Sequence, residues 1–147
     1  DEFFHRRSIF DSFLTARNIP LVTCPGCGYP TLNEKAAYEI CQLCWWEDDG
    51  QDDPRADEVW GGPNSNLSLT MIRLEIGAEL FEYAKELGGT INDDPAEVLY
   101  LLQSHQSHIT ALIPEISAGT DFNKPGSKHY HPRATSMFQR LIKPSQT

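Results

Sequence analysis

Hydrophobic side chains recur at helical spacing in two long segments of the chain. In residues 3–18 they lie mostly three or four positions apart, at Phe3, Phe4, Ile9, Phe10, Phe13 and Leu14. Residues 69–87 repeat this spacing, at Leu69, Ile72, Ile76, Leu80, Phe81, Ala84 and Leu87. Because such positions share one face of an α-helix, the pattern predicts two amphipathic helices. We expect the first helix to pack its phenylalanine face on the domain; the alternative is a face that docks on a partner.

Capping residues give the predicted helices their boundaries. Asn18 ends the first helix, Ser68 is a good N-cap for the second, and Gly88 ends the second. Residues 94–97 place an acidic cap, a proline at the first helical position and a glutamate two residues later. A third helix is therefore predicted to start there and to continue to Pro114.

The C-terminal part carries two histidine-containing segments. His105 and His108 lie one turn apart on the predicted third helix, and the loop over residues 117–132 contains His129 and His131. Such pairs can bind a metal ion, but no further ligand has matching spacing. We therefore expect polar helix surface and a surface loop, followed by a last short helix over residues 135–143.

The four cysteines of the chain form two C-x-x-C pairs, Cys24 with Cys27 and Cys41 with Cys44. Two such pairs are the usual sequence form of a four-thiolate metal site. Zinc is the expected cofactor, as one structural ion, because it accepts a tetrahedron of sulfurs and each pair supplies two ligands. Iron in the same tetrahedron, two disulfides and a redox dithiol are the alternatives.

Short apolar segments surround the two cysteine pairs. Residues 21–23 favour a strand that leads into the first pair, and residues 29–32 and 38–40 favour the arms of a hairpin with its turn at 33–35. The predicted fold class is therefore α+β, with a small zinc-ribbon β-hairpin module packed with three to four α-helices. The expected parts are an N-terminal amphipathic helix (1–20), a zinc-ribbon domain with its following helix (21–89) and a C-terminal helical extension (90–147).

Acidic residues outnumber basic ones along the chain. Twelve Lys and Arg against twenty-one Asp and Glu give a formal net charge of −9. Zinc bound by four thiolates would add +2 − 4 = −2, which makes about −11. Such a surface repels phosphate backbones and attracts basic proteins, so we expect a protein partner and no nucleic acid.

The cell compartment is predicted from the absence of a signal-peptide pattern and of a long apolar run in the sequence. Residues 1–7 mix both charges and no apolar h-region follows them, so they do not form a signal peptide. No apolar run approaches the ~18 to 20 residues that span a bilayer. We therefore expect a cytoplasmic protein with reduced thiols and no membrane partner.

Three spaced motifs are the basis of a family resemblance. They are Cys24-Pro25-x-Cys27-Gly28-Tyr29, then Tyr38-Glu39-Ile40-Cys41-x-x-Cys44-x-Trp46-Glu47-Asp48-Asp49, then Asn66-x-Ser68-Leu69. Together they resemble the bacterial cysteine-rich CPCC family over roughly residues 22–75. Gly26 stands where the family motif has its middle cysteine. The resemblance implies a zinc-ribbon protein of a largely unassigned family, some members of which accompany polymorphic or secreted toxins as immunity proteins.

An acidic run with tryptophans follows the second cysteine pair. An EF-hand is excluded, because placing Gly50 sixth in the loop puts Trp45 first and Ala56 twelfth. A solvated or helix-capping loop and an acidic patch for a partner remain as alternatives. Of Trp45 and its neighbour, we expect one to cover the metal site and the other the core. The candidate partner-binding residues are Trp46, Glu47, Asp48, Asp49, Asp52, Asp53 and Trp60.

These features favour a binding protein over an enzyme. Zinc held by four cysteines has no open position for water, and no H-E-x-x-H, G-x-S-x-G or phosphate-binding loop occurs. We expect a small acidic zinc-binding protein that inhibits a partner with a basic surface. With the resemblance, the expected role is an immunity protein that neutralises a cognate bacterial toxin effector, a nuclease among the candidates. The alternative is a zinc-ribbon nucleic-acid-associated or general protein-interaction module.

Overall fold

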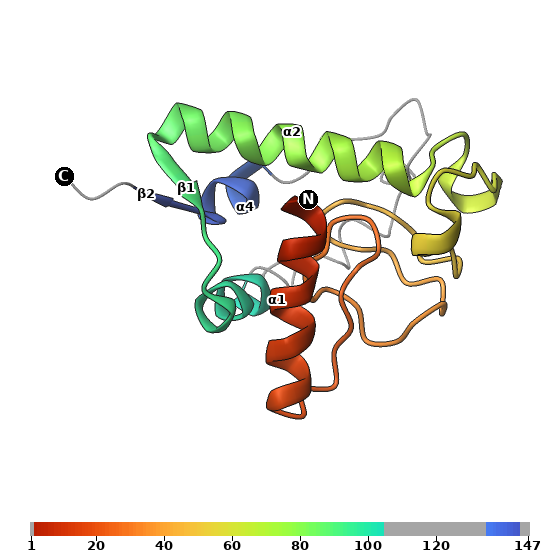
Figure 1. Ribbon diagram of the computed structural model, residues 1–147, viewed down its shortest axis with the longest axis horizontal. Helices are drawn as coiled ribbons and strands as arrows, with labels where there is room; N and C mark the ends of the chain where they lie inside the picture. The colour runs from red at the N-terminus through yellow and green to blue at the C-terminus, as the bar shows by residue number, and fades with distance from the viewer. Residues whose placement is uncertain (1, 105–134, 145–147) are drawn as a thin grey trace, which may run out of the picture.

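The computed structural model describes residues 2–104 and 135–144. The elements in chain order are α1 (Glu2–Ala16), η1 (Asp53–Arg55), η2 (Gly62–Asn64), α2 (Leu69–Leu87), β1 (Gly89–Ile91), α4 (Thr135–Arg140) and β2 (Ile142–Pro144). Residues 95–104 are also helical. Figure 1 shows α2 lying across one side of the molecule, with the first turn of α1 beneath its middle and the loops that follow α1 beside it.

Both long amphipathic helices are confirmed. α1 ends two residues earlier than expected, and its buried side chains are Phe3, Arg6, Phe10 and Leu14. α2 begins where predicted, because the Ser68 hydroxyl accepts a hydrogen bond from the Met71 amide at 3.2 Å. It ends at Gly88, which takes the left-handed conformation with φ of 64°.

The predicted start of the third helix is also confirmed. The Asp94 carboxylate accepts hydrogen bonds from the amides of Ala96 and Glu97, at 3.2 and 3.5 Å. The helix is described as far as residue 104. The rest of its predicted length, with His105 and His108, lies outside the described residues, as do the predicted loop at 117–132 and its two histidines.

The predicted hairpin between the cysteine pairs is wrong. Val22 pairs with Leu32 across the first C-x-x-C turn, and Ile40 pairs with Glu47 across the second. Each turn reverses the chain, so the segment after a turn lies against the segment before the same turn. The two segments expected as hairpin arms therefore flank different C-x-x-C turns and do not pair with each other.

The two-stranded sheet of the described residues lies elsewhere, at the far end of α2. β1 and β2 pair antiparallel, with Gly89 opposite Pro144 and Ile91 opposite Ile142. The last helix was expected to reach residue 143, but α4 stops at Arg140 because the chain then enters β2. This pairing fixes the C-terminal segment against the end of α2.

One hydrophobic core joins all these parts. It contains Phe10 from α1, the four cysteines, the inward side chains of α2 such as Ile72 and Leu80, and Phe138 and Leu141 from the C-terminal segment. The cysteine cluster is thus part of the main core. Among the described residues, no helix is both long and apolar enough to cross a membrane.

Candidate metal centre

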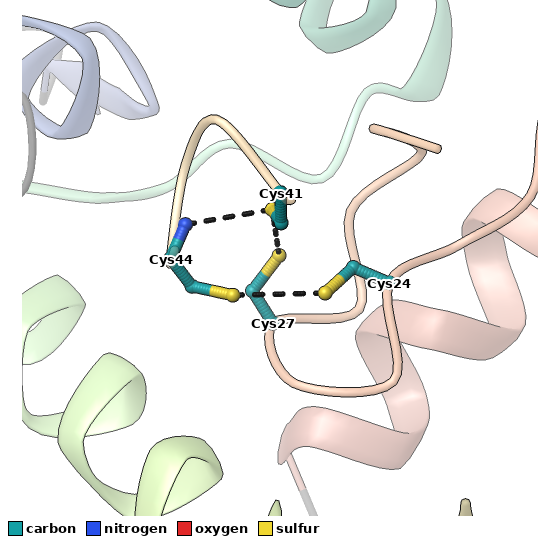
Figure 2. A group of neighbouring side chains, drawn as sticks. All are labelled: Cys24, Cys27, Cys41 and Cys44. Atoms are coloured by element: carbon teal, nitrogen blue, oxygen red, sulfur yellow. Dashed lines mark hydrogen bonds between the residues drawn. The ribbon is translucent and has the colours of Figure 1, made fainter. Parts of the chain in front are cut away.

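The four cysteine sulfurs converge on one point. Cys24 and Cys27 come from one loop and Cys41 and Cys44 from another, and Figure 2 shows the side chains turned toward a common centre. The Sγ atoms of Cys24 and Cys44 are 3.6 Å apart, and those of Cys27 and Cys41 are 3.7 Å apart. All four sulfurs lie within 4.8 Å of one another, and all four residues are buried.

This geometry fits one tetrahedral metal ion. With Zn–S bonds of about 2.3 Å, the sulfurs of a regular tetrahedron lie about 3.8 Å apart. The separations of 3.6 and 3.7 Å are close to that value and far longer than the ~2.05 Å of a disulfide bond. The thiols are free. The cluster is therefore consistent with one structural metal ion, and a tetrahedron of sulfurs suits zinc and iron alike.

The two C-x-x-C turns have the same backbone design. In each, the amide that follows the second cysteine donates to the carbonyl of the first: Gly28 N to Cys24 O, and Trp45 N to Cys41 O, both at 2.8 Å. The donor residue has positive φ in both turns, 81° at Gly28 and 69° at Trp45. Glycine adopts this conformation without a Cβ clash, whereas Trp45 is held there by its turn.

The sulfur of Cys41 has several hydrogen-bond partners besides the other thiols, whereas the Cys24 sulfur accepts from the Gly26 amide at 3.3 Å. The amides of Leu43 and Cys44 donate to the Cys41 Sγ at 3.4 Å, and the Thr31 hydroxyl lies 3.0 Å from the same atom. Burial alone would raise the pKa of Cys41, but hydrogen bonds from the other three thiols and from Thr31 outweigh it and hold this pKa well below the usual value. Burial raises the pKa of Cys24 and of Cys44. These hydrogen bonds therefore favour the thiolate form of Cys41, which is the form in which a cysteine binds a cation.

Replacing Thr31 with valine is expected to weaken the metal site without unfolding it. Valine has the same shape but removes the hydroxyl that lowers the pKa of Cys41, so this pKa rises. Protons then displace the metal at a higher pH, and zinc affinity falls about ten-fold. A chromogenic chelator would report zinc release during an acid titration. Thr31→Ser keeps the hydroxyl and should titrate like the wild type; equal midpoints for all three proteins would contradict this role.

Two arginines hold the first turn from outside. Arg6 of α1 donates its Nε hydrogen to the Cys27 carbonyl at 2.8 Å, and Arg73 of α2 donates to the Pro25 carbonyl at 2.9 Å. Arg6 is only 6% exposed. A divalent ion with four thiolates carries +2 − 4 = −2, and this buried cation offsets part of that charge. The sequence reasoning missed Arg6, although its place on the buried stripe with Phe3 and Phe10 was an available signal.

Gly26 is enclosed by the second turn and by α2. A Cβ atom at this position would lie 3.0 Å from Cγ2 of Ile72 and 3.3 Å from both the Cys44 sulfur and the Cβ of Trp46. A cysteine, as in the family motif, would meet the same atoms. The close packing explains why this chain accommodates glycine here.

Replacing Gly26 with alanine is expected to destabilise the fold by about 1–3 kcal/mol through overpacking. The substitution Ile72→Leu removes the nearest atom, Cγ2, and should restore most of that loss in the double variant. Urea denaturation of the four proteins in the cycle, with zinc present, measures the coupling. Strictly additive effects would contradict the contact.

Several carboxylates of the acidic run after the second turn accept hydrogen bonds from backbone amides of loop residues. Trp46 is buried in the core. Asp48 is a buried polar residue, and its carboxylate accepts hydrogen bonds from the amides of Ala36 and Gly50. The Asp49 carboxylate accepts from the Gln51 amide at 3.1 Å. These side chains hold backbone amides of loop residues, and the helix-capping alternative applies to Asp52, which caps η1 by accepting from the Asp53 amide at 2.8 Å.

Two of the carboxylates join an ion-pair network with arginines from the two long helices. Asp52 lies 2.7 Å from Arg7 of α1, and Asp53 lies 2.6 Å from Arg73 of α2. Burial raises the pKa of Asp52, but the hydrogen bond and charge of Arg7 outweigh it and lower this pKa. The network ties the acidic run to both helices.

Of the remaining candidate partner-binding residues, Glu47 is half-buried and Trp60 is exposed. The backbone of Glu47 is held by the buried amide side chain of Asn64, which accepts from Glu47 N at 3.0 Å and donates to its carbonyl at 2.8 Å. The sequence reasoning missed Asn64, since an asparagine in a loop carries no distinguishing pattern. The seven candidates thus do not form one exposed patch.

Comparison with known proteins gives a match over the part of the chain that contains the cysteine cluster. Residues 22–78 match the family model described as Cysteine-rich CPCC. No curated protein and no solved structure matches the chain. The matched segment contains both C-x-x-C turns, the acidic run and the first half of α2. The part of the chain that holds the candidate metal centre is therefore a cysteine-rich CPCC domain.

Proposed function

We propose that this protein is a cytoplasmic, non-enzymatic zinc protein that binds and inhibits a protein partner with a basic surface. On the family resemblance, the partner is a cognate bacterial toxin effector, and the protein serves as its immunity protein. The observation that carries the proposal is the combination of a closed, buried four-cysteine site with a net charge of −9. A closed site leaves no position for substrate, and an acidic surface speeds the capture of basic proteins.

The placement of the arginines favours a protein over a nucleic acid as partner. Arg6, Arg7 and Arg73 are largely buried or paired with the acidic run, so they are not displayed for phosphate contacts. Nucleic-acid binding depends mainly on accessible positive charge. Among the carboxylates, Asp57 and Glu58 stay exposed beside the network.

Affinity purification of the full chain from its own cell, followed by a binding assay with the neighbouring gene product, tests the proposal. A specific complex is expected, with an association rate that falls steeply as salt is added. Cells that express the neighbouring product should survive only when this protein is present. Failure to bind and failure to protect would together overturn the proposal.

A further inference from the structure

A groove of about 500 Å³ lies between the first turn of α1 and the outer side of α2. Figure 1 shows these two elements close together, with the start of α1 under the middle of α2. Apolar groups from both helices line the groove, namely Phe3, Phe4, Leu74, Gly77 and Ala78. None of the four cysteines lines the groove, and the acidic run contributes Asp53 to it.

Gly77 lies in the lining of the groove at the middle of α2. A glycine inside a helix lowers helix stability by about 1 kcal/mol relative to alanine. No described atom lies within 4 Å of the place where its Cβ would be, so the packing of the described residues does not require glycine. The missing side chain leaves room for another backbone to approach α2 closely.

An apolar stripe extends the groove along α2. Leu74 is 70% exposed and Phe81 is 62% exposed, and Met71 and Phe4 are also exposed. Positions 71, 74, 78 and 81 share one face of the helix because they are spaced by three and four residues. Large apolar side chains gathered on one exposed face mark an interaction surface.

Buried arginines and exposed acidic residues both line the groove. The arginines that line it are largely buried: Arg6 belongs to the buried side of α1, and Arg73 of α2 stacks over the Phe3 ring at 4.1 Å. Three exposed residues place carboxylates in its lining: Glu2, Asp53, which is paired with Arg73, and Asp57, which accepts a hydrogen bond from the Thr70 hydroxyl. The groove therefore offers an apolar floor with an acidic rim to anything that approaches it.

We propose that this groove is a docking site for an amphipathic helix of the partner protein, with an apolar face and flanking lysine or arginine residues. The apolar face would lie along Leu74, Ala78 and Phe81, with its backbone nearest Gly77, and its basic residues would meet the acidic rim. The inference rests on the proposed function only in taking a protein as the partner. It places the apolar part of the binding surface on α2, with Asp53 as the contribution of the acidic run to the rim.

The test uses a synthetic amphipathic helical peptide of about 18 residues made of leucine and lysine, long enough to be helical once bound. The zinc-loaded full chain should bind it, with amide NMR shifts centred on Leu74, Gly77 and Ala78. Gly77→Leu fills the groove without changing charge and should bind at least ten-fold more weakly; Leu74→Ser should do the same. Tyr100→Ala, an exposed position on another helix, is the matched control and should bind like the wild type.

Several results would overturn the proposal. These are absence of binding, equal affinity for the wild type and Gly77→Leu, or equal binding of a leucine–glutamate peptide of the same pattern. Concentration-dependent dimerisation that Gly77→Leu abolishes, without peptide binding, would assign the groove to a second copy of the chain instead. Circular dichroism of each variant confirms that it is folded.

The groove and the proposed function can fail separately. If the neighbouring gene product binds the wild type and Gly77→Leu equally well, the inhibitor role stands and the groove assignment falls. If the leucine–lysine peptide binds through the groove but no gene product does, the surface stands and the immunity role falls.

Discussion

Replacing Cys41 with serine is expected to unfold the protein in the presence of zinc. Cys41 is one of the four cysteines that would bind the metal, and its sulfur also accepts two backbone hydrogen bonds that shape the second turn. Structural zinc contributes on the order of 10 kcal/mol to folding in small zinc domains, which is comparable with the whole stability of an ordinary domain. The sulfurs lie inside the main core, so their loss is not confined to a peripheral loop. Thermal denaturation followed by circular dichroism should show no cooperative transition for this variant.

The control for this experiment keeps all four thiols. Thr31→Val loses only a hydrogen bond to the same sulfur, so with excess zinc it should still unfold cooperatively. Removing zinc from the wild type with a chelator should reproduce the effect of Cys41→Ser. A serine variant that melts within a few degrees of the wild type would mean that the cluster is not what holds the fold together.

Replacing Trp46 with alanine is expected to lower the free energy of unfolding by about 3–5 kcal/mol. This side chain is 1% exposed and is among the largest of the fully buried side chains in the described residues. It follows the second C-x-x-C turn directly and lies beside Gly26 of the first, so its removal leaves a cavity between the two turns. Urea denaturation with saturating zinc measures the loss.

Trp60 provides a matched control, because it is 43% exposed and its indole donates to the exposed Glu58 carboxylate, at 3.0 Å. Trp60→Ala should change the free energy of unfolding by no more than about 0.5 kcal/mol. Similar losses for the two alanine variants would contradict the different burial of the two tryptophans. Both were candidates for partner contact, and the structure leaves only Trp60 accessible.

Local signals predicted the two long helices and the clustering of the four cysteines. The caps at Ser68 and Asp94 act within a few residues of their partners, so the sequence around each position is sufficient to recognise it. The clustering of Cys24, Cys27, Cys41 and Cys44 could be predicted from their spacing, because a C-x-x-C turn places its two sulfurs on the same side.

The strand pairing could not be predicted in the same way. β1 and β2 are three residues each and lie about fifty residues apart in sequence, too short and too distant to leave a periodic pattern. The hairpin prediction failed because residues 29–32 and 38–40 match a strand pattern that does not specify the pairing partner. The C-x-x-C turns set the pairing, because each turn brings the segments on its two sides together. The acidic run likewise suggested an exposed patch, whereas Asp48 binds backbone amides and Asp52 binds Arg7 from a distant helix.

X-ray absorption at the zinc edge, on the full chain purified without added metal, tests the central claim most directly. That claim is that the four cysteines form one closed metal site built into the core. We predict one zinc ion per chain with four sulfur neighbours at about 2.3 Å and no nitrogen or oxygen ligand. A site with an oxygen or nitrogen ligand, or a metal-free chain that keeps its fold, would contradict the claim.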